Sequence, residues 1–216
     1  MAEGLELRQV RIARGGRDLL ALDRRIAPGE VVTLMGPSGA GKSTLLAYLT
    51  GTLPPGFTAT GSVRLDGTDI TRLPPESRRI GILFQDDLLF PHLSVGGNLA
   101  FGLPPGGSRA DRRARIAAAL AEVGLDGFAD RDPSTLSGGQ KARVALVRML
   151  LSGPRALLLD EAFSGLDAAR RARIRDLVFD HARRRGLPVL MVTHDAGDAA
   201  AAGGDVIVLA GDAPDP

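Results

Sequence analysis

Apolar residues are arranged in two ways along this chain. Short runs of apolar and β-branched residues are typical of strands, and longer stretches with apolar residues at helical spacing are typical of helices. The short runs predict strands at 5–12, 19–26, 31–35, 62–65, 80–84, 156–159, 189–193 and 206–209. The helical patterns predict helices at 43–50, 108–123, 138–152, 167–185 and 195–202.

The order of these elements predicts an α/β fold. The early strands follow one another closely, which favours antiparallel pairing, and Asp66-Gly67 predicts a turn after the fourth strand. The later strands alternate with helices, which favours a parallel sheet with right-handed crossovers. We expect one domain spanning 1–216, with a mainly parallel core sheet and a small antiparallel β subdomain. The mostly helical segment at about 87–151 is predicted to be an inset helical subdomain, and the tail at 211–216 to be disordered.

Composition narrows the class of protein only slightly. The chain has no cysteine, which excludes disulfides and thiol-based metal sites, and its N-terminus lacks the pattern of a secretory signal. No apolar stretch is long enough to span a membrane, so we expect a cytoplasmic protein. The net charge of +2 is too small to indicate nucleic-acid binding. Arginines cluster at 109–115 and 170–185; a solvated helix face is the favoured interpretation, and a phosphate-contacting patch is the alternative.

A glycine-rich octet lies between the predicted strand at 31–35 and the predicted helix at 43–50. It matches the phosphate-loop pattern G-x-x-x-x-G-K-[ST] at every position. Its residues are Gly36, Pro37, Ser38, Gly39, Ala40, Gly41, Lys42 and Ser43, followed by Thr44. The glycines allow successive N–H groups to surround phosphate oxygens, and the helix start adds partial positive charge. Lys42 would contact the β and γ phosphates, and the Ser43 hydroxyl would ligate Mg²⁺. The alternative is a glycine-rich turn that opens an ordinary helix.

Two carboxylates end the apolar run at 157–159. Ligands of parallel sheets bind beyond the carboxyl ends of the strands, so Asp160 is predicted to lie beside the phosphate loop and to hold Mg²⁺. Glu161 would lie nearer the γ phosphate and could orient or deprotonate an attacking water. The alternative is a strand that ends in an acidic loop.

The segment Leu136-Ser137-Gly138-Gly139-Gln140 is the second strong signal. Ser137 is a good N-cap for the amphipathic run that follows it. Two glycines just inside a helix are locally unfavourable, and such exceptions are expected where backbone approaches a ligand closely. The segment therefore predicts a second anion site.

These motifs resemble those of the ATP-binding subunits of ABC transporters, over essentially the whole chain. The octet at 36–43 is similar to their Walker A motif, L-L-L-D-E at 157–161 to Walker B, and L-S-G-G-Q at 136–140 to their signature. The resemblance implies a P-loop NTPase fold of the ABC ATPase type. It also implies ATP and Mg²⁺ as ligands.

Three further motifs of the family have matches in the same order. Gln85 resembles the Q-loop glutamine that reaches Mg²⁺ and the water, and Ser164-Gly165-Leu166-Asp167 resembles the D-loop. His194 resembles the switch histidine that contacts the γ phosphate. His92 and His181 match no motif and are interpreted as surface residues.

The resemblance implies a site shared by two copies of the chain. In the family, two subunits stack head to tail, with each ATP between the phosphate loop of one copy and the signature of the other. One copy would contribute 36–44, Gln85, Asp160, Glu161 and His194, with Mg²⁺ held by Ser43, Gln85 and Asp160. The partner copy would contribute Ser137, Gly138, Gly139, Gln140 and Asp167.

The chain departs from the family pattern at three places. The family stacks adenine on an aromatic residue near the end of the first strand, but 12–16 contains none. Either Arg14 stacks on the base as a planar cation, or base affinity is weak. Ala162 stands where proline is usual, and Gly97 where glutamate is common.

The resemblance implies an ATPase that powers transport through a membrane permease. The compact chain is similar to short bacterial importer subunits, including those near the thiamine importer. An extracytoplasmic substrate-binding protein would be a further partner, and no binding to nucleic acid is expected. The subunit would lie in the cytoplasm, on the inner face of the cell membrane. The apolar segment at 87–91 would dock the permease, or Leu89 and Phe90 would belong to the core of the inset. The alternative function is a soluble ABC-type ATPase acting on DNA or the ribosome, which the lack of heptads and duplication disfavours.

Overall fold

The computed structural model describes residues 3–209, which form two compact units. The first unit comprises 1–82, 155–161 and 179–216 where these are described. The second comprises 83–154 and 162–178. The predicted disordered tail lies outside the described residues.

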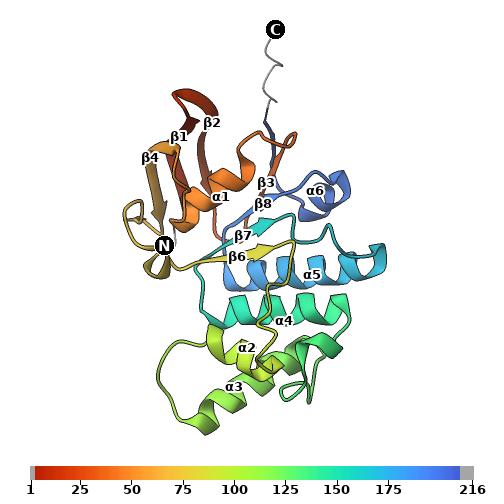
Figure 1. Ribbon diagram of the computed structural model, residues 1–216. Helices are drawn as coiled ribbons and strands as arrows, with labels where there is room; N and C mark the ends of the chain where they lie inside the picture. Colours follow the sequence, from red (N-terminus) through yellow and green to blue (C-terminus); the bar gives the residue numbers. More distant parts are fainter. Residues whose placement is uncertain (1–2, 210–216) are drawn as a thin grey trace. The chain divides into compact units, whose positions relative to one another are not determined.

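An antiparallel sheet opens the first unit (Figure 1). Its strands are β1 (Leu5–Arg14), β2 (Arg17–Ile26), β4 (Phe57–Leu65) and β5 (Thr68–Asp69), in the order β2-β1-β4-β5. Along β1, buried apolar residues alternate with more exposed, mostly polar residues, because only one face of the sheet packs on the core. The predicted antiparallel pairing is confirmed, and Asp66 and Gly67 form the predicted turn, both with φ in the left-handed region.

The second sheet is parallel and has five strands. They are β3 (Val31–Met35), β6 (Ile80–Phe84), β7 (Ala156–Asp160), β8 (Val189–Val192) and β9 (Val206–Val208), in the order β6-β7-β8-β3-β9. The central strands β7 and β8 are almost entirely buried, as continuous apolar runs require when both faces are covered. β3 and β7 both pair with β8, so their carboxyl ends lie at the same edge of the sheet.

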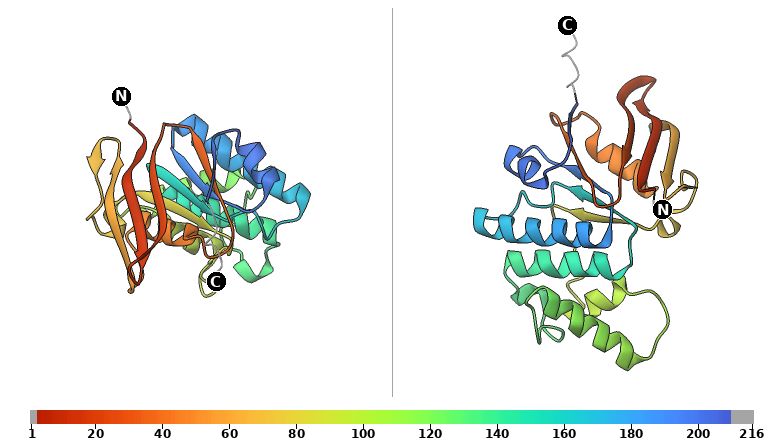
Figure 2. Two further views of the ribbon diagram at one scale, coloured as in Figure 1. Left: turned by 90° about the horizontal axis from the view of Figure 1, so that it is seen from above. Right: turned by 180° about the vertical axis from the view of Figure 1, so that it is seen from behind.

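Helix α1 (Lys42–Thr50) joins the two sheets into one core. The core combines side chains from β1, α1 and β7, such as Leu5, Leu45 and Leu158, each fully buried. The right-hand view of Figure 2 shows the helix between the two sheets. At its C-terminus, the buried Arg78 guanidinium donates to the carbonyls of Tyr48 and Leu49, at 2.7 and 3.0 Å. The cation thus satisfies backbone acceptors that the end of a helix leaves unpaired, and burial lowers its pKa. The unit also contains α6 (Ala196–Ala202) and a short 3₁₀ turn, η1 (Pro75–Ser77).

The second unit is helical. Its elements are α2 (Val95–Gly102), α3 (Arg109–Glu122), η2 (Pro133–Thr135), α4 (Gly138–Leu151) and the part of α5 (Ala168–Arg185) up to residue 178. Leu99, Leu120 and Val144, one from each of α2, α3 and α4, meet in a core of their own.

Several boundaries differ from the sequence prediction. Helix α2 was not predicted because Gly96 and Gly97 have low helix propensity; burial of Val95 and Leu99 outweighs that cost. β4 begins five residues before the predicted strand, and β5 was not predicted. His92 is exposed, as expected, whereas His181 is half-buried, so its assignment to the surface was wrong in part.

Candidate active site

The phosphate loop connects β3 to α1 in the first unit. Gly39 and Gly41 have φ of 87° and 80°, in the left-handed region that side chains disfavour. Gly41 is the N-cap of α1 and has no side chain to accept from the first helical N–H groups. A Cβ added at Gly39 would meet no atom within 4 Å. The loop therefore presents open, positively polarised backbone, as a phosphate site requires.

Lys42 lies at the first position of α1 and is 8% exposed. Its Nζ donates to the carbonyls of Gly36 and Pro37, both at 2.7 Å. The Lys42 side chain thus reaches back over the phosphate loop to its first residues, and its ammonium group lies near the N-terminus of α1. This arrangement gathers positive charge where phosphate oxygens would lie.

Asp160 ends β7 and reaches the same loop. The Ser43 hydroxyl lies 3.4 Å from its Oδ1, although 117 residues separate the two in sequence. Burial raises the pKa of Asp160 and the nearby Glu161 charge adds to this, while the Ser43 hydrogen bond and Lys42 act in the opposite direction. A half-buried carboxylate beside a second carboxylate is stabilised by a cation, and oxygen is the ligand that Mg²⁺ prefers. Ser43 and Asp160 therefore fit a magnesium ion that phosphates would help to hold.

Glu161 and His194 meet at the same edge of the sheet. His194 Nδ1 lies 3.3 Å from Glu161 Oε2, and the carboxylate side chain is 32% exposed. Glu161 has φ of 49°, a left-handed conformation that is strained for a residue with a side chain. Its N–H donates to Val192 O at 3.0 Å, which fixes it to the end of β8. A partly exposed carboxylate next to an imidazole can accept a proton from water.

The turn that carries His194 is held by its own hydrogen bonds. The N–H of Asp195 donates to Thr193 Oγ1 at 3.0 Å. Asp195 Oδ1 accepts from the N–H groups of Gly197 and Asp198, at 2.8 and 3.0 Å, and caps α6. The histidine side chain projects from this turn and is 65% exposed.

The second unit holds the signature segment. Ser137 is the N-cap of α4, as predicted, and forms a reciprocal capping box with Gln140. A Cβ added at Gly138 would meet nothing within 4 Å, whereas one at Gly139 would lie 3.2 Å from Arg170 Cδ. Asp167 Oδ1 accepts from the Arg170 N–H at 3.1 Å, so the D-loop segment lies beside the signature.

Each unit therefore brings together its own share of the predicted residues. In the first unit, the loop at 36–44 lies with Asp160, Glu161 and His194. In the second unit, the start of α4 at 137–140 lies with Asp167. Gln85 also belongs to the second unit; it follows β6 directly and is exposed.

The sequence did not predict one residue that could take part in binding the adenine base of ATP. Phe57 lies opposite Arg14 in the β1–β4 register, and the Arg14 guanidinium carbon is 5.3 Å from the centre of its ring. The hairpin of β1 and β2 runs beside the phosphate loop, since a Cβ at Gly41 would lie 3.5 Å from the Cβ of Leu20 on β2. Phe57 fell outside the predicted strands, and only the pairing of β4 with β1 reveals it. Its ring supports the guanidinium that one of the two sequence alternatives assigns to the base.

The fold and the phosphate loop define this protein as a P-loop NTPase. Among residues 3–209, no helix combines the length and apolarity that crossing a membrane requires. The family model "ABC transporter" matches residues 19–164. The chain belongs to the ABC transporter family, as its motifs predicted.

Similar proteins carry ABC transporter names. The Escherichia coli (strain K12) protein "Uncharacterized ABC transporter ATP-binding protein YnjD" is 51% identical over 173 residues, 80% of each chain. "Thiamine import ATP-binding protein ThiQ" of Jannaschia sp. (strain CCS1) is 46% identical over 198 residues, 90% of this chain and 84% of the relative. "Fe(3+) ions import ATP-binding protein FbpC" of Streptomyces coelicolor is 44% identical over 207 residues, 95% of this chain and 59% of the relative. The predictions of an ABC-type α/β fold and of an ATPase of this family are confirmed.

Proposed function

We propose that this chain is the ATP-hydrolysing subunit of an importer and that it drives transport through a membrane permease. The observation that carries the proposal is the joint position of Lys42, Ser43, Asp160, Glu161 and His194 at one edge of the parallel sheet. Relatives named for thiamine and Fe(3+) import support the importer class. A permease partner would hold the subunit at the inner face of the cell membrane, and an extracytoplasmic binding protein would deliver the cargo.

The residues of the first unit divide the chemistry between them. The loop N–H groups and Lys42 bind and orient the phosphates, and they stabilise the charge that develops on the transferred phosphoryl oxygens. Glu161 orients a water toward the γ phosphate and takes its proton, and His194 holds the Glu161 carboxylate in place. Ser43 and Asp160 would hold Mg²⁺, which when bound neutralises phosphate charge.

The signature would complete the site of a second copy. The space around Gly138 is open and Ser137 is exposed, so the start of α4 is accessible to a ligand from outside the chain. We infer that ATP bound to the phosphate loop of one copy contacts Ser137, Gly138, Gly139 and Gln140 of the other copy, with Asp167 beside them. The γ phosphate would then bridge both copies, and its hydrolysis would release them.

Mixing two inactive variants tests this arrangement. Lys42→Ala removes the phosphate-loop cation, and Gly138→Asp places a negative charge in open space at the signature without a steric clash. We expect each variant alone to have lost nearly all ATP hydrolysis. A mixture should recover hydrolysis, because one site of the mixed dimer combines an intact phosphate loop with an intact signature. Hydrolysis is measured by phosphate release as the two variants are titrated against each other.

The result of the mixing experiment distinguishes a site shared by two copies from a site formed within one copy. Recovery that peaks at an equal ratio supports the shared site. A mixture that stays as inactive as its components, although both variants retain the wild-type thermal unfolding transition, would mean that loop and signature act within one copy.

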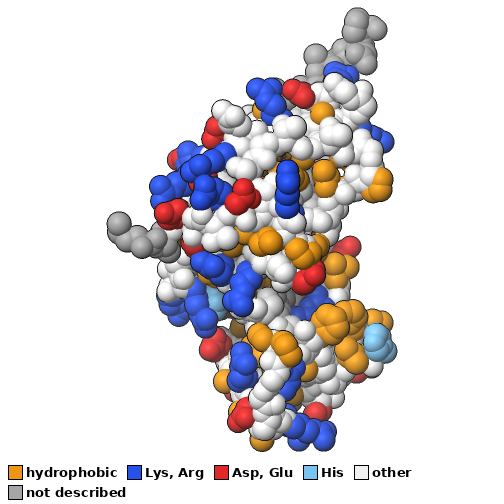
Figure 3. All heavy atoms as spheres, turned by 90° about the vertical axis from the view of Figure 1, so that its left-hand side faces the viewer, with side chains coloured by type: hydrophobic (Ala, Val, Ile, Leu, Met, Phe, Trp, Pro, Cys, Tyr) orange, Lys and Arg blue, Asp and Glu red, His pale blue; other side chains and the backbone are white. Residues whose placement is uncertain are grey.

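The second unit presents an apolar surface suited to a protein partner. Leu88 and Phe101 are 56% and 71% exposed. The Phe90 ring lies between Phe101 and His92, with ring centres at 4.8 and 5.9 Å. Figure 3 shows hydrophobic side chains gathered around a histidine on this surface. We call Leu88, Phe90 and Phe101 the docking patch. Leu89 packs against the helical core, as the alternative of an inset core expected for it, whereas Leu88 is exposed and free to take part in the proposed docking.

The buried Asn98 and the half-buried Arg148 fix the backbone of this patch. Asn98 accepts from the Phe90 N–H at 2.8 Å, and its amide donates to Phe90 O and Leu93 O. Arg148 on α4 donates to Leu88 O at 2.8 Å and Asp87 O at 3.1 Å. The patch is therefore preorganised rather than loose, which lowers the entropic cost of binding. An apolar helical segment exposed by the permease would fit it.

Replacing Phe101 by Ser is expected to weaken retention by the permease at least about tenfold, since a buried aromatic anchor of an interface typically contributes that much. The ring is mostly exposed in the isolated chain, so folding and basal ATP hydrolysis should be unchanged. Val208→Ser, at a residue of β9 that is 72% exposed, is the matched control. Co-purification of tagged subunit with its permease from solubilised membranes measures the effect. Equal retention of both variants would exclude Phe101 from the interface.

A further inference from the structure

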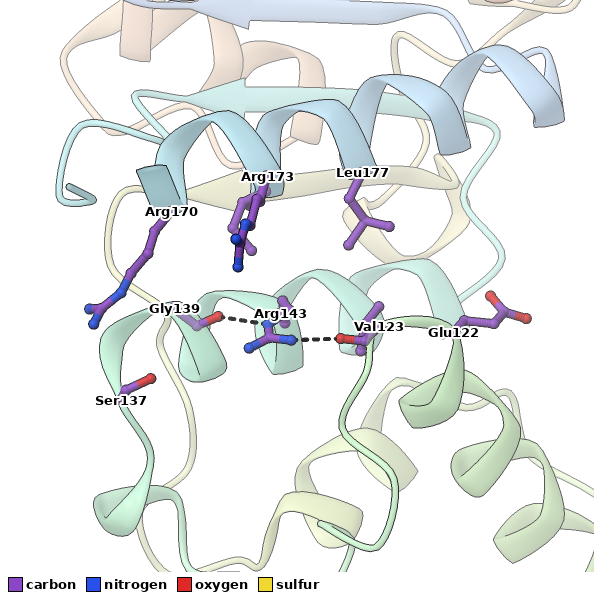
Figure 4. Close-up of a pocket in the computed structure, with 9 residues that line it drawn as sticks. Glu122, Val123, Ser137, Gly139, Arg143, Arg170, Arg173 and Leu177 are labelled. Carbon is purple, nitrogen blue, oxygen red and sulfur yellow. Dashed lines mark hydrogen bonds between the residues drawn. The ribbon is translucent and has the colours of Figure 1, made fainter. Parts of the chain in front are cut away.

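A cavity of about 310 Å³ lies in the second unit beside the signature segment. It lies between α4 and the first half of α5, with the end of α3 at one side. Its lining residues are Glu122, Val123, Ser137, Gly139, Arg143, Arg170, Arg173, Ile174 and Leu177. In Figure 4, Arg170, Arg173 and Leu177 project from one face of α5 toward α4, where Arg143 lies.

Positive charge in this cavity is poorly balanced. Arg143 donates to two neutral carbonyls, Gly139 O at 3.2 Å and Val123 O at 2.8 Å. Arg173 has no ion pair within residues 3–209. Arg170 pairs with Asp167 at 3.1 Å, but both side chains are more than half exposed, so the pair is weak. The carboxylate of Glu122 points away from the arginines (Figure 4).

The arrangement also opposes the helix dipole. The stem of Arg170 contacts the first turn of α4, where the helix carries partial positive charge. A Cβ at position 139 would lie 3.2 Å from Arg170 Cδ, so a larger residue there would push the Arg170 stem outward by a few tenths of an ångström. Cations gathered at a positive helix end are unfavourable in the absence of an anion. Such local conflict is expected at a binding site.

We propose that this cavity binds an anion of the phosphate class through Arg143, Arg170 and Arg173. Guanidinium groups match the geometry of phosphate oxygens and form charge-assisted hydrogen bonds with them. Part of the arginine cluster at 170–185, namely Arg170 and Arg173, thus faces a cavity instead of only solvent. The anion is either inorganic phosphate, the product of ATP hydrolysis, or the phosphate group of a small organic ester. Only the first of these sources rests on the proposed function.

Titration calorimetry with inorganic phosphate tests the cavity in the full chain carrying Lys42→Ala, which disables the phosphate loop as a competing site. We expect saturable binding at one site per chain. Adding Arg173→Gln should weaken it about tenfold, the typical effect of losing one charge-assisted hydrogen bond. Arg113→Gln is the matched control, because Arg113 is an exposed arginine on α3 outside the cavity and changes the net charge equally.

Each outcome has a defined meaning. Unsaturable binding, or equal weakening by Arg113→Gln and Arg173→Gln, would overturn the proposal, because attraction would then depend on net charge alone. Phenyl phosphate in a parallel titration distinguishes the sources: tighter binding than inorganic phosphate indicates an organic ester whose body contacts Leu177. A wild-type chain that fails to hydrolyse ATP would refute the proposed function and leave the calorimetric result standing.

Discussion

Glu161→Gln is expected to reduce ATP hydrolysis at least about a hundredfold while ATP still binds. A positioned general base typically contributes between a hundredfold and ten-thousandfold, and the amide of glutamine cannot take the proton. The substitution preserves the size of the side chain, so the backbone at φ 49° and the packing of residue 161 beside His194 should be retained. Nucleotide affinity should therefore stay near that of the wild type. With hydrolysis blocked, an ATP-bound dimer should accumulate.

Steady-state phosphate release and size-exclusion chromatography with MgATP measure the two effects. Glu76→Gln is the matched control, because Glu76 is exposed on η1 in the same unit and lies away from the phosphate loop in the chain. Hydrolysis within a few fold of wild type in Glu161→Gln would show that another group takes the proton. A variant that is inactive yet never dimerises with ATP would instead contradict the shared site.

Lys42→Ala should weaken ATP binding at least tenfold and lower hydrolysis by about a hundredfold to a thousandfold. That is the range seen when one preorganised hydrogen-bond donor to the transition state is removed. Lys42 is nearly buried and donates to both Gly36 O and Pro37 O. Titration with a fluorescent nucleotide measures the ATP affinity, and phosphate release measures the rate of hydrolysis.

Lys42→Met separates charge from packing. Its unbranched side chain preserves most of the aliphatic contact at the start of α1, and its thioether carries no charge. Equal losses in the alanine and methionine variants, with thermal unfolding unchanged, assign the effect to the ammonium. An ATP affinity within twofold of the wild type in either variant would remove Lys42 from the site.

The two substitutions probe different parts of one arrangement. Lys42 acts on phosphates in the ground state and during transfer, whereas Glu161 acts only when water attacks. Both ATP binding and turnover should therefore fall in the first variant, whereas only turnover should fall in the second. The same contrast separates a motor subunit from a nucleotide switch without turnover, which would tolerate Glu161→Gln.

Short segments were predicted well where consecutive residues determine the structure. Ser137 caps α4, as its residue type and the amphipathic run after it predicted, and the glycines at 39 and 41 adopt the left-handed angles that a phosphate loop needs. Segments that depend on neighbours were predicted poorly. Gly61 in β4 is tolerated because its backbone approaches Gln9 so closely that a Cβ would lie 2.4 Å from the Gln9 carbonyl.

The sequence by itself determined the class of fold, the ATP-binding motifs and their order. The predicted nearness of Ser43 and Asp160 became a contact of 3.4 Å in the structure. Only the tertiary structure decided that Glu161 contacts His194 and that Arg170 lies against Gly139. Caps and glycine loops are encoded locally, because a few adjacent residues set the allowed backbone angles. Contacts between distant residues depend on strand register and on the burial of many apolar side chains at once, and no short segment contains that information.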